Sequence, residues 1–336
     1  MTIYDISKMA GVSIATVSRV LNGNTNVSPK TKKKVLDVIE QSGYTPNAFA
    51  RGLGLNTMKT IGILCADSSD LYLAKAIYHI ERALQADGYN SILCCTGYDL
   101  KNKKTSLNLL LSQRVDSVIM IGSHFIEANQ EDNQYIREAA QQIPFMLLNA
   151  DFDCPNVYCT LCDDFKAMQE VTLSLIDSGI KDILYLYNSK SYSGLKKLSG
   201  YQSAFLLRDI PIDKNYQQFF AGDHNDIEGV SKFLNSLASD GLSFHAIVAS
   251  EDLLAAAAVK YARSNQLHIP AELSIIGYNN SILSNCCEPE LTSVDNRLES
   301  ICTQLVKTLI NTLSGKEMPQ KTIFSGELVK RGTTAF

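Results

Sequence analysis

Apolar positions recur with two different periods along the chain, and the change of period divides it into two parts. In residues 1–46 the apolar residues follow helical spacing, with Val17, Val20 and Leu21 at i, i+3 and i+4. From Thr60 onward, short apolar runs typical of buried strands alternate with longer helical runs. The pattern predicts a small helical head followed by a larger α/β body.

Start and stop signals place the first two helices of the head. Thr2 and Asp5 can form a capping box at the start of a helix over residues 3–10. Gly11 can end that helix in a left-handed turn, and Ser13 is expected to cap the next one.

A third helix is expected to start at Ser28 and Pro29 and to end at Gly43. The side chains of the head that are expected to face inward are Val17, Val20, Leu21, Val35, Leu36, Val38 and Ile39.

The second helix leaves a largely polar face outside its apolar side. This face consists of Ile14, Ala15, Thr16, Ser18, Arg19 and Asn22. Three short helices with a tight turn between the first two are typical of a helix-turn-helix, whose second helix enters the DNA major groove. The polar face is therefore predicted to meet DNA.

Charge is distributed unevenly between the two parts. Residues 1–60 contain eight lysines and arginines but only three acids, a net charge of +5 within a chain of net charge −4. The remainder therefore carries −9. A basic head on an acidic body is what nucleic-acid binding by the head alone requires, because neutralising phosphates drives that binding.

The pattern of apolar residues in the body predicts alternating strands and helices. Strands are expected in the runs TIGILCAD, NSILCC, DSVIMIG, PFMLLN, DILYLYN, YQQFFAG, HAIVAS and ELSIIGY. Helices are expected between them, for example LYLAKAIYHIERALQADG and LESICTQLVKTLINTLSG. This rhythm predicts parallel sheets covered by helices, with ligands at the carboxyl ends of the strands.

The chain shows neither an apolar run long enough to span a membrane nor a signal peptide at its start, so we expect a cytoplasmic protein that associates with the nucleoid through DNA. Nine cysteines, including the pairs Cys94-Cys95 and Cys286-Cys287, are expected to be buried thiols in a reducing compartment.

Residue patterns of catalysis or metal binding are weak. The segment CTLC at Cys159 to Cys162 has no second pair of ligands, and five scattered histidines lack metal-ligand spacing. No phosphate loop or nucleophile elbow occurs. We therefore expect no enzyme activity, no catalytic residue, no metal and no cofactor.

Several segments together resemble the LacI/GalR family of bacterial transcription regulators. They are YDISKMAGVSIATVSRVLNG and VSPKTKKKV in the head, YTPNAFARGL after it, and KTIGILCAD, LLLSQRVDSVIMIGS, SGYQSAF, AIVASEDLLAAAAV, ELSIIGYNN and LTSVDNRLESICTQLV in the body. The resemblance covers essentially the whole chain. It implies a three-helix helix-turn-helix head, a hinge helix, and a two-lobed body like a periplasmic binding protein.

The resemblance also implies domain boundaries. Residues 1–46 would form the DNA-binding domain, 47–59 the hinge helix and linker, and 60–336 the domain for effector binding and dimerisation. Lobe one would take about 60–160 and 293–322, and lobe two about 161–292 and 323–336, with a short strand in FSGELVKRGTT at the last crossing.

Functional residues of the family can be carried over to matching positions. Base edges would be read by Ile14, Ala15 and Arg19; only Arg19 can make hydrogen bonds there, to guanine O6 and N7, while Ile14 and Ala15 would make apolar contacts. Contacts to the DNA backbone would come from Tyr4, Ser13, Thr16, Ser18, Asn22, Thr31, Tyr44 and Asn47. Residues 48–53 would form a hinge helix on DNA, and Leu53 would be a wedge in the minor groove.

An effector is expected in the cleft between the lobes. By the same resemblance its contacts would be Asp70, Tyr72, Ser123, His124, Asn149, Lys197, His224, Glu251, Asp252 and Asn279. Many relatives have an arginine at the position of Lys197 and acids at the positions of Asn279 and Asn280. The identity of the ligand therefore cannot be inferred from that of a relative. A sugar or sugar derivative fits carboxylates, amides and an aromatic ring.

These observations predict a homodimeric, sequence-specific repressor whose affinity for a pseudo-palindromic operator changes when a small molecule binds. The chain ends at RGTTAF without leucine heptads, which favours a dimer over a coiled-coil tetramer. Activation of transcription, a non-sugar ligand or a protein co-effector remain alternatives. A periplasmic sugar-binding protein would share the body, but it would need a signal peptide and would lack the basic head.

Overall fold

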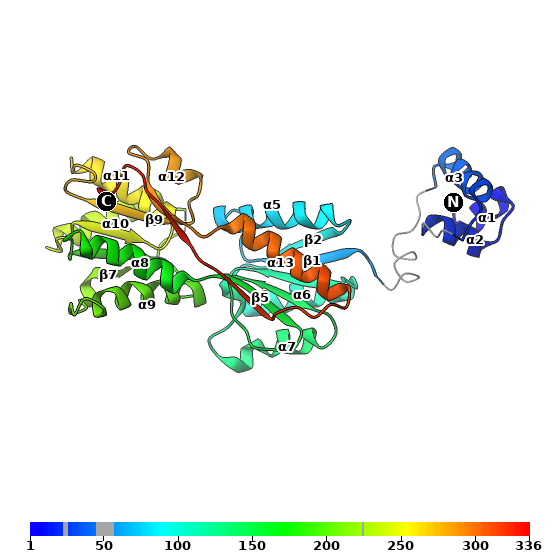
Figure 1. Ribbon diagram of the computed structural model, residues 1–336, viewed down its shortest axis with the longest axis horizontal. Helices are drawn as coiled ribbons and strands as arrows, with labels where there is room; N and C mark the ends of the chain where they lie inside the picture. Colours follow the sequence, from blue (N-terminus) through cyan, green and yellow to red (C-terminus); the bar gives the residue numbers. More distant parts are fainter. Residues whose placement is uncertain (23–25, 45–56, 224) are drawn as a thin grey trace. The chain divides into compact units, whose positions relative to one another are not determined.

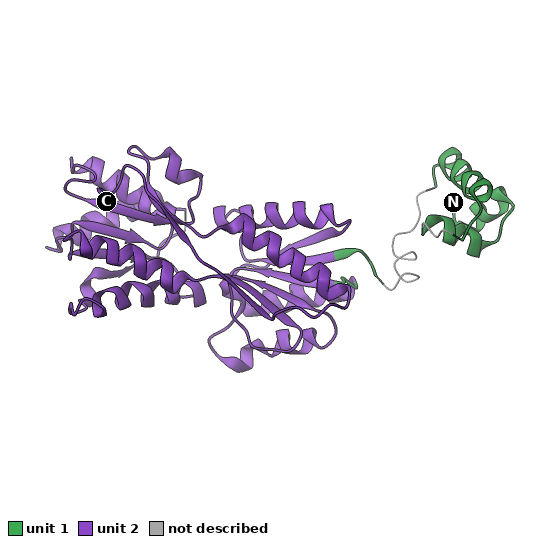
Figure 2. Ribbon diagram, in the orientation of Figure 1, with its two compact units in different colours: residues 1–60, 114–116 green, residues 61–113, 117–336 purple. Residues whose placement is uncertain are grey.

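The computed structural model describes residues 1–22, 26–44, 57–223 and 225–336. They form two compact units, residues 1–60 with 114–116 and residues 61–113 with 117–336 (Figure 2). The expectations for Asn47, Leu53, the hinge helix at 48–53 and His224 lie outside the described residues.

The head contains the three helices expected from its capping residues: α1 (Ile3–Ala10), α2 (Ile14–Leu21) and α3 (Pro29–Ser42). The Asp5 carboxylate accepts a hydrogen bond of 2.8 Å from the Thr2 backbone N–H, and Gly11 has φ of 57° after α1. Ser13 accepts the Thr16 N–H at 3.2 Å. Local side-chain chemistry thus defines where each helix begins and ends.

The core of the head is formed by Ile6, Ala10, Val17, Val20 and Val35, all of which are buried. Leu21, Val38 and Ile39 pack against this core, as the helical period predicts.

Leu36 differs from the expectation, because 45% of its surface is exposed. In α3 the inward stripe is already filled by Val35, Val38 and Ile39 at i, i+3 and i+4. Leu36 follows Val35 directly, and about 100° of helical rotation turns it away from the stripe.

The cap at Ser28 gives a test of the head's stability. Its hydroxyl accepts the Thr31 N–H at 3.2 Å, so Ser28→Ala should cost α3 about 1 kcal/mol. Hydrogen exchange of the α3 amides in the intact chain should then become about fivefold faster. Ser42→Ala, at the other end of α3, should change it less. Equal exchange in Ser28→Ala and the parent chain would show that the cap contributes nothing.

Lobe one is a six-stranded sheet in the order β11-β5-β4-β3-β1-β2. Helices α5 (Leu71–Ala86) and α13 (Leu298–Leu313) pack into the core on one face, and α6 (Leu100–Ser112) and α7 (Gln134–Ala140) lie on the other (Figure 1). The strands are β1 (Thr60–Cys65), β2 (Asn90–Cys95), β3 (Ser117–Ile121), β4 (Phe145–Leu148), β5 (Val157–Cys162) and β11 (Lys321–Phe324).

Lobe two is a second six-stranded sheet, in the order β12-β10-β9-β8-β6-β7. Helices α8 (Asp164–Asp177) and α9 (Tyr192–Leu206) cover one face, α10 (Ile227–Ser239) and α11 (Asp252–Ser264) cover the other, and α12 (Ile282–Cys286) follows β9. The strands are β6 (Ile183–Tyr187), β7 (Gln217–Phe219), β8 (Ala246–Ala249), β9 (Ser274–Tyr278), β10 (Thr292–Asp295) and β12 (Glu327–Val329).

Strand direction follows the βαβ pattern. Strands β3 and β4 pair in parallel, for example at Val118 and Phe145, and β8 pairs in parallel with β9. Only β12 among the pairs described runs antiparallel to its neighbour, β10. The loops that follow the parallel strands therefore gather at the carboxyl ends of both sheets, where the lobes meet.

The chain crosses between the lobes three times: after β5, after β10 and between β11 and β12 (Figure 1). Each crossing lies a few residues beyond the boundaries expected at about 160, 293 and 322. Pairing causes the shift, because Cys162 is still in register with Phe324, and Thr292–Asp295 pairs with lobe two. The segment expected to hold one short strand holds part of β11 and all of β12, one in each sheet.

All nine cysteines are free thiols. Cys159 and Cys162 are buried as predicted, but Cys95 and Cys286 are exposed, so the expectation of uniformly buried thiols is wrong for them. No helix in the described ranges is long and apolar enough to cross a bilayer.

Candidate functional site

Helix α2 presents the three residues expected to read bases. Ile14, Ala15 and Arg19 are all exposed, with 39% of Ile14 accessible, while Val17 and Val20 are buried on the opposite side. The apolar pair and the guanidinium thus share one surface of the head.

The residues expected to contact the DNA backbone differ in how far they are exposed. Tyr4 is 63% exposed, and Tyr44 packs partly into the head's core. The Ser13 and Thr16 hydroxyls hydrogen-bond each other at 2.9 Å, and the hydroxyl of Thr31 meets that of Ser28 at 2.8 Å. Ser18 and Asn22 are half-buried neighbours on α2, with Asn22 Nδ2 at 3.5 Å from Ser18 Oγ.

A cavity of about 100 Å³ lies between the two lobes, and we call it the inner chamber. It brings together eight of the residues expected to bind an effector. They are Asp70, Tyr72, Ser123, His124, Asn149, Lys197, Glu251 and Asn279. All of them lie at or just beyond the ends of strands, or in the first turns of the helices that follow.

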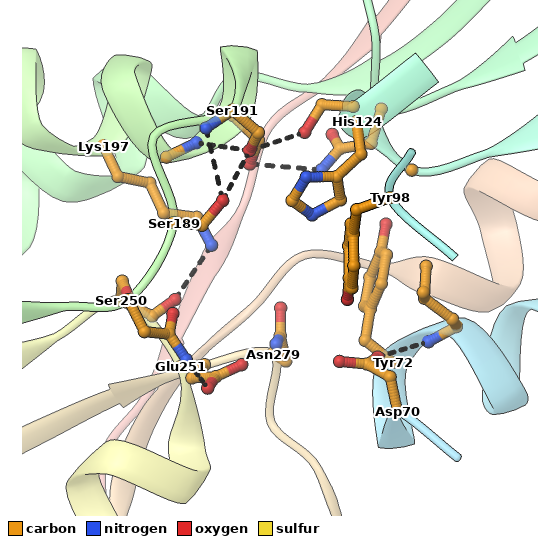
Figure 3. A pocket seen from close by; sticks show the side chains of 17 residues that line it. Asp70, Tyr72, Tyr98, His124, Ser189, Ser191, Lys197, Ser250, Glu251 and Asn279 are labelled. Atoms are coloured by element: carbon orange, nitrogen blue, oxygen red, sulfur yellow. Dashed lines mark hydrogen bonds between the residues drawn. The ribbon is translucent and has the colours of Figure 1, made fainter. Parts of the chain in front are cut away.

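Lobe one contributes an aromatic wall with a carboxylate at its end (Figure 3). Asp70 caps α5 by accepting the Leu73 N–H at 2.8 Å, which places Tyr72 in the first turn beside it. The Tyr98 ring meets the His124 ring edge-on, with centroids 4.9 Å apart. Burial, followed by the nearby Asp70 charge, raises the pKa of Tyr98 to about 12.

Lobe two contributes a buried cation. Lys197 on α9 is only 8% exposed, and its Nζ donates to the Ser250 carbonyl at 2.9 Å (Figure 3). The same Nζ lies 3.8 Å from the Tyr278 ring centroid. Such contacts compensate for removing an ammonium from water. Beside it, Glu251 accepts a hydrogen bond of 2.5 Å from Asn188 Nδ2.

Asn279 closes the chamber from the end of β9 with a positive φ of 97°, a conformation in which most side chains are strained. Its Oδ1 accepts from Asn296 Nδ2 at 3.0 Å, at the second crossing between the lobes. Unlike a carboxylate, the amide has a nitrogen that can donate to a ligand.

The two lobes also bond to each other directly at the chamber. Ser123 of lobe one and Ser191 of lobe two share a hydrogen bond of 2.8 Å, and Asn149 Nδ2 donates to Ser193 Oγ at 3.3 Å. A ligand that replaces these bonds would change the energy that holds the lobes together.

Asp164, directly after the first crossing, organises the polar groups behind the chamber. Its buried carboxylate accepts from Ser193 Oγ at 2.5 Å and from the Tyr278 hydroxyl at 2.6 Å. Because Ser193 also meets Asn149, and Tyr278 lies under Lys197, Asp164 connects a crossing segment to the chamber lining.

Asp252 does not line the inner chamber, but it borders an adjoining cleft pocket together with Asp70, Tyr72, Glu251 and Asn279. It is 2% exposed, and its carboxylate accepts from the Ser281 N–H and from Ser293 Oγ, each at 2.5 Å. Burial raises the pKa of Asp252 despite these bonds. As the first residue of α11 it turns inward over Gly277, where a Cβ would collide with it. Asp252 therefore supports the loop after β9 in addition to bordering the cleft.

Sequence reasoning missed nine of the residues that line the inner chamber. They are Leu73, Tyr98, Gly122, Asn188, Ser189, Ser191, Ser193, Gly194 and Ser250. Five of them lie in one segment, 188–194, at the carboxyl end of the strand expected in DILYLYN. Because ligands bind at the carboxyl ends of parallel strands, the sequence could have indicated this segment.

Comparisons with known proteins agree with this architecture of a helix-turn-helix head joined to a two-lobed binding-protein body. Residues 2–47 match the family model "Bacterial regulatory proteins, lacI family", and residues 173–334 match a periplasmic binding protein-like domain. The chain is 55% identical over 336 residues, the full length of both proteins, to an HTH-type transcriptional regulator of Lachnoclostridium phytofermentans. It is 33% identical over 297 residues to catabolite control protein A of Priestia megaterium, covering 88% of this chain and 87% of that one.

Solved structures show the same fold. The lac repressor dimer bound to operator and the anti-inducer ONPF aligns with a TM-score of 0.88 at 22% identity, over 99% of this chain and 98% of that one. A complex of the transcriptional regulator CelR with cellobiose aligns with a TM-score of 0.72 at 23% identity, over 99% and 100% of the two chains. The protein belongs to the LacI family and is a transcriptional regulator.

Proposed function

We propose that this regulator is a repressor that binds operator DNA and dissociates from it when a sugar or sugar derivative binds in the inner chamber. The observation that carries the proposal is the chamber lining itself. Carboxylates, amides, hydroxyls and tyrosine rings from both lobes face one cavity, and polyhydroxyl ligands are held by such groups.

The proposed DNA surface is the exposed face of α2. Arg19 would read a guanine through two hydrogen bonds, and Ile14 and Ala15 would make apolar contacts with base edges. Tyr4, Ser13, Thr16 and the other backbone candidates would fix the head's register on the phosphates. We propose a homodimer on a pseudo-palindrome, with hinge residues 48–53 and Leu53 in the minor groove between two major-groove contacts, and hence action on the chromosome in the cytoplasm.

The proposed coupling runs through the contacts between the lobes. A ligand in the inner chamber competes with the hydrogen bonds of Ser123 with Ser191 and of Asn149 with Ser193, and so shifts the angle between the lobes. A coupling free energy of about 1 to 3 kcal/mol would change operator affinity roughly 5- to 150-fold.

A screen by thermal shift tests the effector class. The intact protein is heated with sugars, sugar phosphates, sugar acids and nucleobases, and a ligand at 100 times its Kd should add about 2.7 kcal/mol of stability. A sugar that stabilises the body and weakens operator binding supports the proposal. Stabilisation by a nucleobase alone, or by no small molecule while a protein partner alters operator binding, would reject a sugar effector.

Lys197 gives a sharper test of the site. Lys197→Met keeps most of the packing over Tyr278 but removes the ammonium, so effector affinity should fall about tenfold or more. Isothermal titration with the stabilising sugar measures the change. Lys196→Met, the exposed neighbour on α9, is the matched control and should bind normally. Unaltered affinity in Lys197→Met would leave Lys197 with a purely structural role.

A further inference from the structure

The cleft continues beyond the inner chamber into a second cavity, which we call the outer chamber. Its volume is about 370 Å³, larger than the 100 Å³ of the inner chamber. Six residues line both cavities, so the two are neighbours with a shared wall: Tyr98, Ser123, His124, Asn188, Ser189 and Ser191. The outer chamber adds Lys103, Ile126, Glu127, Ala128 and Lys190.

We infer that the outer chamber is a second sugar subsite, and that the effector is an uncharged oligosaccharide of at least two rings rather than a monosaccharide. This inference rests on the proposed sugar effector and names its size. One ring would occupy the inner chamber, and the next would lie in the outer chamber on the far side of the shared wall.

The shared wall has the chemistry of a junction between two sugar rings. The Tyr98 and His124 rings meet edge-on at 4.9 Å and border both cavities, so each cavity has aromatic surface in its wall. Between the cavities, the hydrogen bond of 2.8 Å between Ser123 and Ser191 joins the lobes. A glycosidic linkage passing this point could take hydrogen bonds from both hydroxyls in exchange for the bond between them.

The outer wall on lobe one is held rigidly by buried polar groups. Lys103, 2% exposed, donates from Nζ to the His124 carbonyl at 2.5 Å and to Glu127 at 2.6 Å. Asn133, which is fully buried, accepts the Glu127 N–H at 2.7 Å and donates to the Glu127 carbonyl at 2.9 Å. Such a wall is preorganised, which reduces the entropy lost when a ligand binds against it.

The opposite wall, on lobe two, is also fixed by internal bonds. Ser189 Oγ meets Ser191 Oγ at 2.9 Å and accepts the Ser191 N–H at 3.2 Å. Lys190 beside them lies 4.6 Å from the Phe219 ring centroid. Both walls therefore keep their shape, and the ligand does not have to order either of them.

The charges of the outer chamber favour a neutral ligand. The Lys103 ammonium is paired with the Glu127 carboxylate at 2.6 Å. The Lys190 ammonium keeps its charge, but it lies over the Phe219 ring at the exposed edge, where water and salt screen it. The remaining polar lining consists of hydroxyl and amide groups, together with the His124 ring. Hydroxyls and amides bind sugar hydroxyls as both donors and acceptors.

The test compares each monosaccharide with its own dimer. Isothermal titration of the intact protein uses glucose with cellobiose, xylose with xylobiose, mannose with mannobiose, and N-acetylglucosamine with its β-1,4 dimer. For the matching sugar we expect the dimer to bind about tenfold more tightly than the monosaccharide.

Ala128→Trp fills the outer chamber from an exposed position that does not line the inner one. It should reduce the dimer's affinity to within about twofold of the monosaccharide's and leave monosaccharide binding unchanged. Ala238→Trp, at an exposed alanine on α10 outside both chambers, is the matched control and should keep the advantage of the dimer.

Two results would overturn the subsite while leaving a sugar effector in place: equal affinity for a monosaccharide and its dimer in the parent protein, or equal weakening of both by Ala128→Trp. Binding of no sugar in the panel would reject the proposed effector class itself, and the subsite with it.

Discussion

Replacing Asp164 with alanine is expected to lower the free energy of unfolding of the body by about 3 to 5 kcal/mol. The buried carboxylate accepts two short hydrogen bonds, from Ser193 at 2.5 Å and from Tyr278 at 2.6 Å. Hydrogen bonds to a charged group are strong. Removing the Asp164 carboxylate also takes away the acceptor of the Tyr278 hydroxyl, which is fully buried. The loss should lower Tm by roughly 6 °C or more in a body of this size.

Circular dichroism is a suitable probe of this unfolding, since the chain contains no tryptophan. Asp177→Ala is the matched control, because Asp177 lies on the same helix and its carboxylate pairs with Arg208 at an exposed site, at 2.7 Å. Exposed pairs contribute little to stability, so this variant should melt close to the parent protein. Similar melting of the two variants would mean that the Asp164 network does not stabilise the body.

A second large effect is expected for Arg19→Ala, which should weaken operator binding by about 1 to 3 kcal/mol, or roughly 5- to 150-fold in affinity. Arg19 is exposed on the face of α2 that also presents Ile14 and Ala15, so its guanidinium can reach a base edge. The loss should be confined to one base pair: duplexes with guanine there should lose affinity, while duplexes already altered at that pair should change little.

Fluorescence anisotropy with duplexes selected from a random pool, and with each single-base variant, measures this pattern. Arg19→Lys keeps the charge but not the two-pronged geometry, so it should keep most of the affinity and lose the discrimination. A uniform loss in Arg19→Ala across all base variants would show that Arg19 contacts phosphate and reads no base.

Local signals in the sequence predicted the head well. Caps at Thr2, Ser13 and Ser28 and left-handed glycines fix helix ends through contacts within a few residues, and these are present. The expectation that Leu36 faces inward is wrong, because a run of adjacent apolar residues does not indicate which of them pack into the core.

Strand order and the exact lining of the cleft could not be read in the same way. The sheet of lobe one contains β11, far along the chain, and the crossing after β5 is fixed by pairing of Cys162 with Phe324. Asp252 borders the cleft as its place after a strand predicts, but its bond to Ser293 and its packing over Gly277 could not be read from that place. Strand pairing and the orientation of these side chains depend on contacts with residues that are distant in the sequence.

The three crossings between the lobes also set an order of events during synthesis on the ribosome. The head's core uses only residues up to Tyr44, so it can fold early. Lobe one needs α13 and β11, which include residues up to Phe324, and so it can close only when nearly the whole chain has been made. At about 5 to 20 residues per second, a folded head precedes a complete lobe one by tens of seconds. During that interval the nascent chain carries a folded head without a finished cleft to control it.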